Sequence, residues 1–253
     1  MISIKSEREI ELMRYAGKVT IDTINLIGKN IKVGITTKQL DKIAYDYIIE
    51  HDCTPSCLGY LGYPASVCIS INDEVVHGIP GNRKIKDKDI VSVDLVVCYK
   101  GYHADATRTF IVGDVSDDIK NLVIETKNAF YEGVKKVKEG TRVFEISQAI
   151  EDYAHAHGLS VVEELVGHGI GKEMHEDPNI PNYNDGNNTR LKAGMVIAIE
   201  PMLNSGSKEI YMADDNWTIK TVDGASSAHY ENTVLVTKDG YEIITGEWLN
   251  GKE

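Results

Sequence analysis

The stretch over residues 89–112 constrains the fold more than any other part of the chain, because it predicts a β-hairpin of two long strands. Tyr99-Lys100-Gly101 separates the strands, and its glycine supplies the positive φ that a tight turn needs. Alternation gives the first strand one apolar face, made of Val91, Val93, Leu95 and Val97. We therefore expect this face to pack into the core.

The opposite face of the hairpin carries carboxylates. Asp94 points away from the apolar residues, and on the return strand Asp105 shares its parity with His103, Thr107 and Thr109. With an even register across the turn, Asp94 and Asp105 lie directly opposite each other, with Cβ atoms roughly 5 Å apart. Carboxylates that close repel unless a proton or a metal ion lies between them. A solvated polar face on an edge hairpin is the alternative that the hairpin alone leaves open.

Composition excludes several classes of function. The net charge of −12 argues against binding nucleic acid or an anionic membrane as the main role. No apolar run is long enough to span a bilayer, and the first residues do not have the pattern of a signal peptide. The four cysteines are too few for a disulfide framework in 253 residues. We therefore expect a cytoplasmic protein with reduced thiols that binds neither DNA nor a membrane.

The order of elements suggests two related halves. A long helix, a glycine, a shorter helix and then strands occur twice, and a shift of 106 residues places Gly34 on Gly140 and Tyr47 on Tyr153. We expect a single catalytic domain over residues 1–253, with halves at about 1–113 and 114–253 and a site between them. The predicted helices cover about 7–30, 116–140 and 144–157, and another begins at Thr36 or Thr37 and includes Ile48. The predicted strands cover about 66–71, 89–98, 102–112, 161–166, 195–200, 229–237 and 241–245.

Three segments of the second half bring further polar groups: a histidine between glycines, His168, and carboxylates on two predicted strands, Glu200 and Glu231. Taken singly, they are typical of a loop residue, a strand end before proline and a solvated strand face. Together with Asp94 and Asp105 they supply four carboxylates and one imidazole, a charge that two divalent cations would cancel. Oxygen-rich ligation with one histidine suits Mn(II), Fe(II) or Co(II).

Five segments in order along nearly the whole chain resemble the type I methionine aminopeptidases of peptidase family M24, in their short form. They are CISINDEVVHGIPG, VSVDLVVCYKGYHADATRTFIVG, GHGIGKEMHEDPNIPNY, VIAIEPML and SSAHYENTVLV. The resemblance implies an α+β, pita-bread (creatinase/aminopeptidase) fold: a curved, largely antiparallel sheet backed by helices, in two pseudo-symmetric halves. It also implies a site for two divalent metal ions with the ligands Asp94, Asp105, His168, Glu200 and Glu231.

The activity that the resemblance implies is removal of the N-terminal methionine from nascent proteins and peptides, with preference for a small second residue. Glu200 is then the base that activates a water between the metals, and one metal holds the substrate's α-amino group. His175 is placed to donate to the scissile carbonyl as it becomes an oxyanion, and His77 to contact the substrate's amide nitrogen.

The implied methionine pocket is apolar and rich in sulfur, which suits a flexible thioether. Its walls would be Cys57, Tyr60, Tyr63, Cys68, Met174 and Trp217, each of which is also an ordinary core residue type. Three positions depart from the family pattern: Leu61 and Asn232 replace a histidine found in some or many members, and Met174 replaces the usual phenylalanine. A substrate or accessory-metal contact at position 61 would be missing.

Two other functions share these residues. X-Pro dipeptidases and aminopeptidases P have the same ligands but usually carry an extra N-terminal domain, whereas only about 90 residues precede Asp94 here. A non-catalytic binding module of this fold would have lost ligands, and all five are present. The expected partners are nascent polypeptide N-termini and, through the basic stretch Arg83–Lys88, the ribosome, unless that stretch is simply a solvated loop. We expect a monomer.

Overall fold

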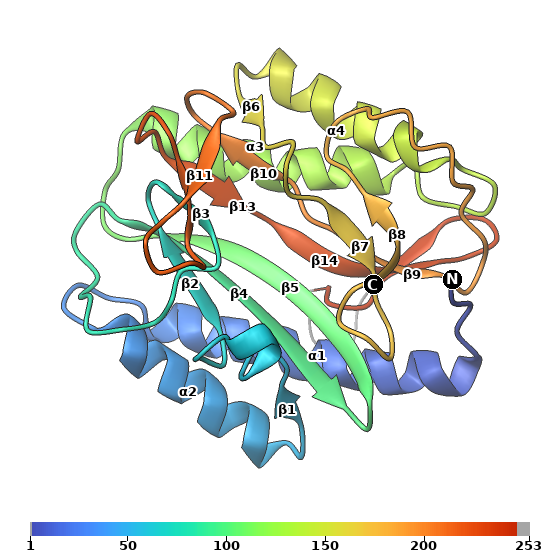
Figure 1. The fold of residues 1–253 in the computed structure, drawn as a ribbon, viewed down its shortest axis with the longest axis horizontal. Coiled ribbons are helices and arrows are strands. Elements are labelled where there is room, and N and C mark those ends of the chain that lie inside the picture. Colours follow the sequence, from blue (N-terminus) through green and yellow to red (C-terminus); the bar gives the residue numbers. More distant parts are fainter. Residues whose placement is uncertain (1, 247–253) are drawn as a thin grey trace.

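The computed structural model describes residues 2–246, in which a curved antiparallel sheet is backed by helices. Figure 1 shows one helix pair along the lower side of the strands and the other pair along the upper side. The helices are α1 (Glu7–Asn30), α2 (Thr37–Glu50), α3 (Asp117–Val134) and α4 (Val143–Ala156), and a short 3₁₀ turn covers Tyr60–Gly62. No helix within residues 2–246 is long and apolar enough to cross a membrane.

The largest sheet runs in the order β1-β4-β5-β14-β9-β7-β8, with β2 also paired to β4 and β15 to β14. Its strands are β1 (Thr54–Pro55), β2 (Cys68–Ile71), β4 (Ile90–Tyr99), β5 (Tyr102–Ile111), β7 (Gly167–Gly169), β8 (Glu176–Ile180), β9 (Val196–Ile199), β14 (Glu231–Val236) and β15 (Tyr241–Ile243). Two three-stranded sheets flank it: β13 (Ser227–His229) with β10 (Met202–Asn204) and β6 (Ser160–Val161), and β11 (Ile210–Met212) with β12 (Ile219–Thr221) and β3 (Glu74–Val76).

The first helix pair begins where the sequence predicts. The Ser6 N–H donates to Glu9 Oε2 (2.8 Å), and the Thr36 N–H donates to Gln39 Oε1 (2.9 Å), so both N-termini are closed by capping boxes. The inward faces of α1 and α2 pack on the apolar face of β4. Leu95 is fully buried there, and burying such a side chain contributes about 1.5–3 kcal/mol.

The β4–β5 hairpin forms as predicted, but the expected register is wrong. Asp94 pairs with Thr107, and Asp105 pairs with Val96, so the two carboxylates are diagonal neighbours on one face. The turn contains only Lys100 and Gly101, at φ 48° and 83°, because Tyr99 pairs with Tyr102 as the last rung of the ladder. This two-residue turn shifts the pairing by two positions, which preserves the face on which both aspartates lie.

Local contacts of the first helix pair recur 106 residues later. The recurring pairs are the bridges Thr36–Lys84 and Arg142–Arg190 and the backbone hydrogen bonds Gly34 N to Ile85 O and Gly140 N to Leu191 O. At the helix ends, His51 Nδ1 lies 2.8 Å from Tyr47 O, and His157 Nδ1 lies 2.8 Å from Tyr153 O. The proposed boundary of the halves at residue 113 stays a prediction.

Two groups of expected boundaries are wrong. Helix α3 ends at Val134 and not at Gly140, and the buried Val137 lies in the segment that follows the helix. Strand β6 is far shorter than the expected 161–166, and β1, β3, β7, β8, β10, β11 and β12 were not expected. Most of these strands have only three residues, which is too short for alternation to be distinguished from an irregular segment.

Candidate metal centre

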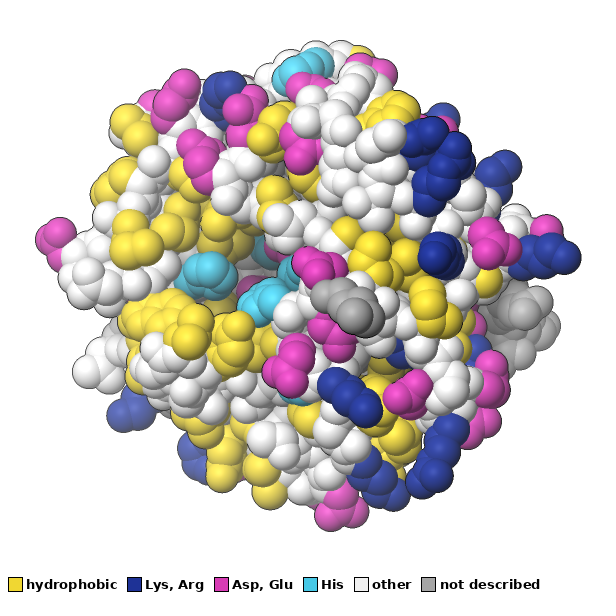
Figure 2. All heavy atoms as spheres, turned by 45° about the vertical axis from the view of Figure 1, so that its right-hand side comes forward, with side chains coloured by type: hydrophobic (Ala, Val, Ile, Leu, Met, Phe, Trp, Pro, Cys, Tyr) yellow, Lys and Arg dark blue, Asp and Glu magenta, His cyan; other side chains and the backbone are white. Residues whose placement is uncertain are grey.

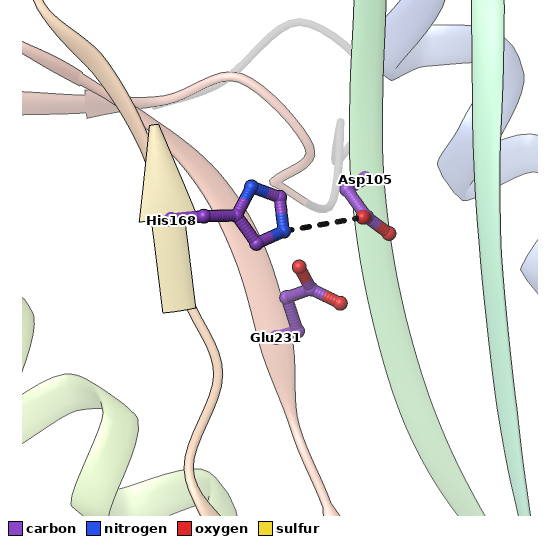
Figure 3. Close-up of side chains that lie close together, drawn as sticks. All are labelled: Asp105, His168 and Glu231. Carbon is purple, nitrogen blue, oxygen red and sulfur yellow. Dashed lines mark ion pairs between the residues drawn. The ribbon is translucent and has the colours of Figure 1, made fainter. Parts of the chain in front are cut away.

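Three buried side chains from different strands converge on the sheet (Figure 3). Asp105 comes from β5, His168 from β7 and Glu231 from β14, and one ligand atom of each lies within 4.8 Å of the others. His168 Nε2 is 3.9 Å from Asp105 Oδ2. The strand order β5-β14-β9-β7 produces this meeting, because it places side chains from both parts of the chain on one face.

The other two predicted ligands lie beside this cluster. Glu200 follows β9 directly, and its Oε1 is 3.5 Å from His168 Nε2. Asp94, on β4, lines one cavity together with Asp105 and a second cavity together with His168 and Glu200. The structure therefore brings together all five residues that the sequence singled out as metal ligands.

The orientation of His168 is fixed by its own strand. Its Nδ1 lies 2.9 Å from the carbonyl oxygen of Gly169, which can only accept a hydrogen bond. Nδ1 therefore carries the proton, and the lone pair of Nε2 is directed at the carboxylates, as metal-binding histidines require. The glycine on the other side is equally constrained, since a Cβ on Gly167 would lie 2.4 Å from Ala198 O.

The buried carboxylates of the cluster repel one another, and a bound cation would offset this repulsion. Burial, together with repulsion from neighbouring carboxylates, raises the pKa of Asp105, Glu200 and Glu231 well above the usual range. Burial lowers the pKa of His168 to about 4, so this ring supplies no positive charge near neutral pH. Asp105 Oδ1 and Glu231 Oε1 are buried and lack a hydrogen-bond partner among the described residues. This donor set of carboxylate oxygens and one imidazole nitrogen fits a divalent metal ion.

Two residues that sequence reasoning did not assign to the site contact these carboxylates. The Thr107 hydroxyl donates to Glu231 Oε2 (2.9 Å), and His229 Nε2 lies 3.6 Å from Glu200 Oε2. Thr107 was placed on the same face as Asp105 by strand parity alone, and that parity was the signal available. His229 was visible only as the residue two before Glu231, which on a strand predicts the same face.

A cavity of about 320 Å³ opens beside the carboxylates. All six predicted pocket residues line it, together with Leu61, His77, Val96, His175 and the carboxylates Asp94 and Asp105. Tyr63 forms the rigid part of the wall, because its hydroxyl donates to Gly78 O (2.9 Å) and its ring packs edge-on against Trp217. Leu61 stands at this cavity with 81% of its surface exposed.

His77 and His175 lie between this cavity and a second one of about 340 Å³, which His168, Glu200 and His229 also line. Tyr60 Oη lies 3.0 Å from His175 Nδ1, and the His175 ring stands edge-on to that of His168, with centroids 4.4 Å apart. In Figure 2, histidine side chains lie in a hollow of the surface that is bordered by hydrophobic and acidic groups. The two cavities thus share His77 and His175, and together they are called the cleft below.

Asn232 lies outside the cleft. Alternation along β14 turns it away from Glu231, and its Oδ1 accepts from Arg108 Nη2 (2.7 Å) and from the Thr245 hydroxyl (3.1 Å). This departure from the family pattern therefore leaves the pocket wall unchanged, whereas Met174 and Leu61 do line the pocket.

A family model for metallopeptidase family M24 matches residues 11–238, nearly the whole chain. The chain belongs to this metallopeptidase family. It is 49% identical over 246 residues to a methionine aminopeptidase of Clostridium perfringens, covering 97% of this chain and 99% of that one. It is 47% identical to methionine aminopeptidase 1 of Bacillus subtilis, with the same coverage.

Comparison with solved structures extends the similarity from the sequence to the fold. The methionine aminopeptidase of Rickettsia prowazekii superimposes with a TM-score of 0.95 at 40% identity, covering 97% of this chain and all of that one. A prolidase of Pyrococcus furiosus gives 0.74 at 23% identity, and this chain covers only 65% of its length. The second likeness shows the fold alone. The α+β pita-bread fold is confirmed, and membership of a metallopeptidase family implies that the chain uses a divalent metal.

Proposed function

We infer that this protein is a methionine aminopeptidase, a hydrolase that removes the N-terminal methionine from proteins and peptides. One observation carries the inference: the buried cluster Asp105–His168–Glu231 adjoins a largely apolar cavity with two cysteines and a methionine in its lining. An apolar, sulfur-lined cavity next to a metal cluster fits an enzyme that recognises a methionine side chain beside the bond that it cleaves. The identity of 45–49% to methionine aminopeptidases over nearly the full chain supports the same activity.

We propose that Asp94, Asp105, His168, Glu200 and Glu231 hold two divalent cations, Mn(II), Fe(II) or Co(II). Once bound, these ions would supply Lewis-acid chemistry and a nucleophile at neutral pH. The unpaired buried oxygens of Asp105 and Glu231 support the proposal, because an ion on them would remove the cost of burying unpartnered charge.

We assign the proton transfers to residues of this chain. Glu200 acts as the base, since its carboxylate lies beside His168 and lines the same cavity as His77 and His175. His175 donates to the scissile carbonyl as negative charge develops on it, and His77 contacts the amide nitrogen of the scissile bond. Their positions along the same cleft support both roles.

We propose that the methionine side chain enters the cavity between Tyr63, Met174 and Trp217, with Cys57, Tyr60 and Cys68 completing the walls. The 320 Å³ of this cavity is bounded by carboxylates at one end, so a bound side chain would bring its own α-amino group towards them. We also propose a preference for a small second residue, as in the family that the sequence resembles.

The decisive experiment measures methionine release by chelator-treated protein before and after addition of Mn(II). Three substrates are compared: Met-Ala-Ser, Met-Lys-Ser and an X-Pro dipeptide. Metal-dependent cleavage of Met-Ala-Ser alone is expected, whereas cleavage of the X-Pro dipeptide would favour the prolidase activity. Asp105→Asn keeps the shape of the side chain and should abolish turnover, while Asp239→Asn, at an exposed turn, should not.

We propose that nascent chains are the natural substrates and that the basic stretch Arg83–Lys88 contacts the ribosome. Its basic side chains are exposed, although Arg83 also pairs with Glu74 at 2.6 Å. Reversing the charge of Lys84 and Lys86 should weaken cosedimentation with ribosomes at low salt; unchanged cosedimentation would reject the contact. A monomer in the cytoplasm is proposed as well, and the four free thiols are consistent with a reducing compartment.

A further inference from the structure

The segment that precedes α1 lies against the loop that carries two residues of the cleft. The Lys5 N–H donates to Gly194 O (2.8 Å), and the Lys5 side chain is only 3% exposed. Its Nζ lies 2.8 Å from Oε2 of Glu176, the residue directly after His175. Lysine is rarely buried this completely unless it is paired, so the N-terminal segment and this loop are joined by a desolvated ion pair.

Glu176 also binds the backbone of the loop that contains His175. Its Oε1 accepts from the N–H of Glu173 (3.2 Å), so one carboxylate joins the two ends of the segment that contains Met174 and His175. Burial alone would raise the pKa of Glu176, but the hydrogen bond from Lys5 and two backbone N–H groups lower it below the usual value. The carboxylate is therefore held ionised by the groups that it connects.

The absence of a side chain at Gly171 leaves space for the Lys5–Glu176 ion pair. A Cβ there would lie 2.5 Å from Lys5 Cε and 2.7 Å from Glu176 Oε1. The Gly171 carbonyl in turn accepts from the backbone N–H of His103 (2.9 Å), and His103 Nδ1 lies 3.0 Å from it. The start of the loop is thus fixed by β5, and its end is fixed by Lys5.

The ring of His175 has less support of its own. Among the described residues, its side chain hydrogen-bonds to the hydroxyl of Tyr60, a residue that is 38% exposed at the mouth of the cleft. The position of the ring therefore depends mainly on the backbone of its own segment, whose C-terminal neighbour is Glu176. A small displacement there moves the ring relative to the carboxylates.

We propose that Lys5 is a positioning residue for the reaction: through its buried ion pair with Glu176 it holds the backbone that aims His175 into the cleft. The N-terminal segment is then part of the catalytic apparatus and not merely a lead into α1. This inference rests on the proposed role of His175 at the scissile carbonyl. The alternative is an ion pair that stabilises the fold without affecting the position of that ring.

A double-mutant cycle separates these possibilities. Lys5→Met, His175→Ala and the double variant are compared by kcat and KM for Met-Ala-Ser with saturating Mn(II), at a temperature at which each is folded by circular dichroism. Misplacing a reacting group by about 1 Å costs on the order of 10²-fold in rate. We therefore expect Lys5→Met to lower kcat by roughly 10–100-fold with a smaller change in KM, and Lys5→Arg to recover part of it.

The decisive result is the effect of Lys5→Met once His175 is absent. If Lys5 acts through His175, the substitution has almost no further effect in the His175→Ala background. Equal effects in both backgrounds would overturn the proposal. If His175→Ala alone leaves kcat unchanged, the proposed role of His175 fails instead, so the two failures are distinguishable. Should Lys5→Met not fold, Glu176→Gln takes its place in the same cycle, because it keeps an acceptor for Lys5.

Amide hydrogen exchange supplies a readout that needs no activity. Lys5→Met should speed exchange over residues 172–176, and the control Lys18→Met should leave it unchanged, because Lys18 pairs with Asp22 on the exposed side of α1. Unchanged exchange over 172–176 in Lys5→Met would also contradict the proposal, since the loop would then be held without the ion pair.

Discussion

Gly169→Ala is the most direct test of the geometry around His168. Gly169 lies in β7, paired with Glu176 of β8 on one side and with Ile197 of β9 on the other. A Cβ at this position would lie 2.2 Å from Asp177 O and 3.0 Å from Glu176 O. Carbon–oxygen contacts of this kind reach about 3.3 Å at their closest. The backbone of β7 must therefore move by about 1 Å relative to β8.

This displacement acts on the neighbouring residue first. His168 would be carried away from Asp105 and Glu200, from which its Nε2 is separated by 3.9 and 3.5 Å. A shift of about 1 Å in a ligand or reacting group costs on the order of 10²-fold in rate, while overpacking costs about 1–3 kcal/mol of stability. We expect Gly169→Ala to remain folded, to lose about 10²-fold in kcat/KM and to bind Mn(II) more weakly.

The assay compares kcat/KM for Met-Ala-Ser with the dissociation constant for Mn(II) measured by calorimetry, and urea unfolding reports stability. Gly240→Ala is the matched control, because a Cβ there would meet no atom within 4 Å. If Gly169→Ala keeps kcat/KM within about threefold of the unmodified protein, a difference below 1 kcal/mol, the close approach of β7 and β8 does not set the position of His168, and the reasoning is refuted.

Three further outcomes follow from single contacts. Thr107→Val removes the donor to Glu231 Oε2 and should weaken Mn(II) binding by about 10–100-fold in calorimetry, while Thr107→Ser should not. Phe130→Ala empties a fully buried site beside α4 and should lower the free energy of unfolding in urea by about 3–5 kcal/mol, with kcat retained. The lowered pKa of Glu176 contributes stability that is present above its unfolded value of 4.5 and lost as pH falls through the folded value. The stability difference between the unmodified protein and Lys5→Met should therefore shrink as the pH is lowered below about 4.5 in denaturation experiments; a constant difference would contradict that origin.

The hairpin and the first helix pair could be predicted because their signals are local. Alternation over ten residues determines the buried face of β4, and Ser6 with Glu9 marks the start of α1 within a single turn. The predicted register was wrong because the sequence around Gly101 permits turns of different length. Alternation determines only the face on which a side chain lies, and not its partner across the strands. A shift of two residues leaves that face unchanged, so no pattern in the chain could reveal it.

The sequence predicted which residues form the candidate site, but not the contacts between their side chains. Asp94, Asp105 and His168 carried signals of charge or of glycine neighbours, and these are visible one residue at a time. Lys5 carried none, because an isolated lysine has no period and no motif, and Thr107 carried only its strand parity, which gives a face and no partner. Their contacts join positions 171 and 124 residues apart in the chain, and only the folded topology brings such positions together. The catalytic and ligand roles remain predictions.

The carboxylates of the cleft lie where β5 pairs with β14, and their mutual repulsion opposes this pairing. Strands β5 and β14 pair at two positions there, and the carboxylates of Asp105 and Glu231 repel each other across the two strands. Neutral and cationic groups on the same strands offset the repulsion: the Asp105 N–H donates to the Thr233 hydroxyl (2.8 Å), and Arg108 Nη1 donates to Glu231 O (2.6 Å). Both bonds involve backbone groups, and Arg108 pairs with Val93 on the face opposite the carboxylates, so the bonds hold the strands without neutralising the site. The negative cluster is therefore preorganised by the fold itself, which is the condition under which a metal ion can bind without paying for rearrangement.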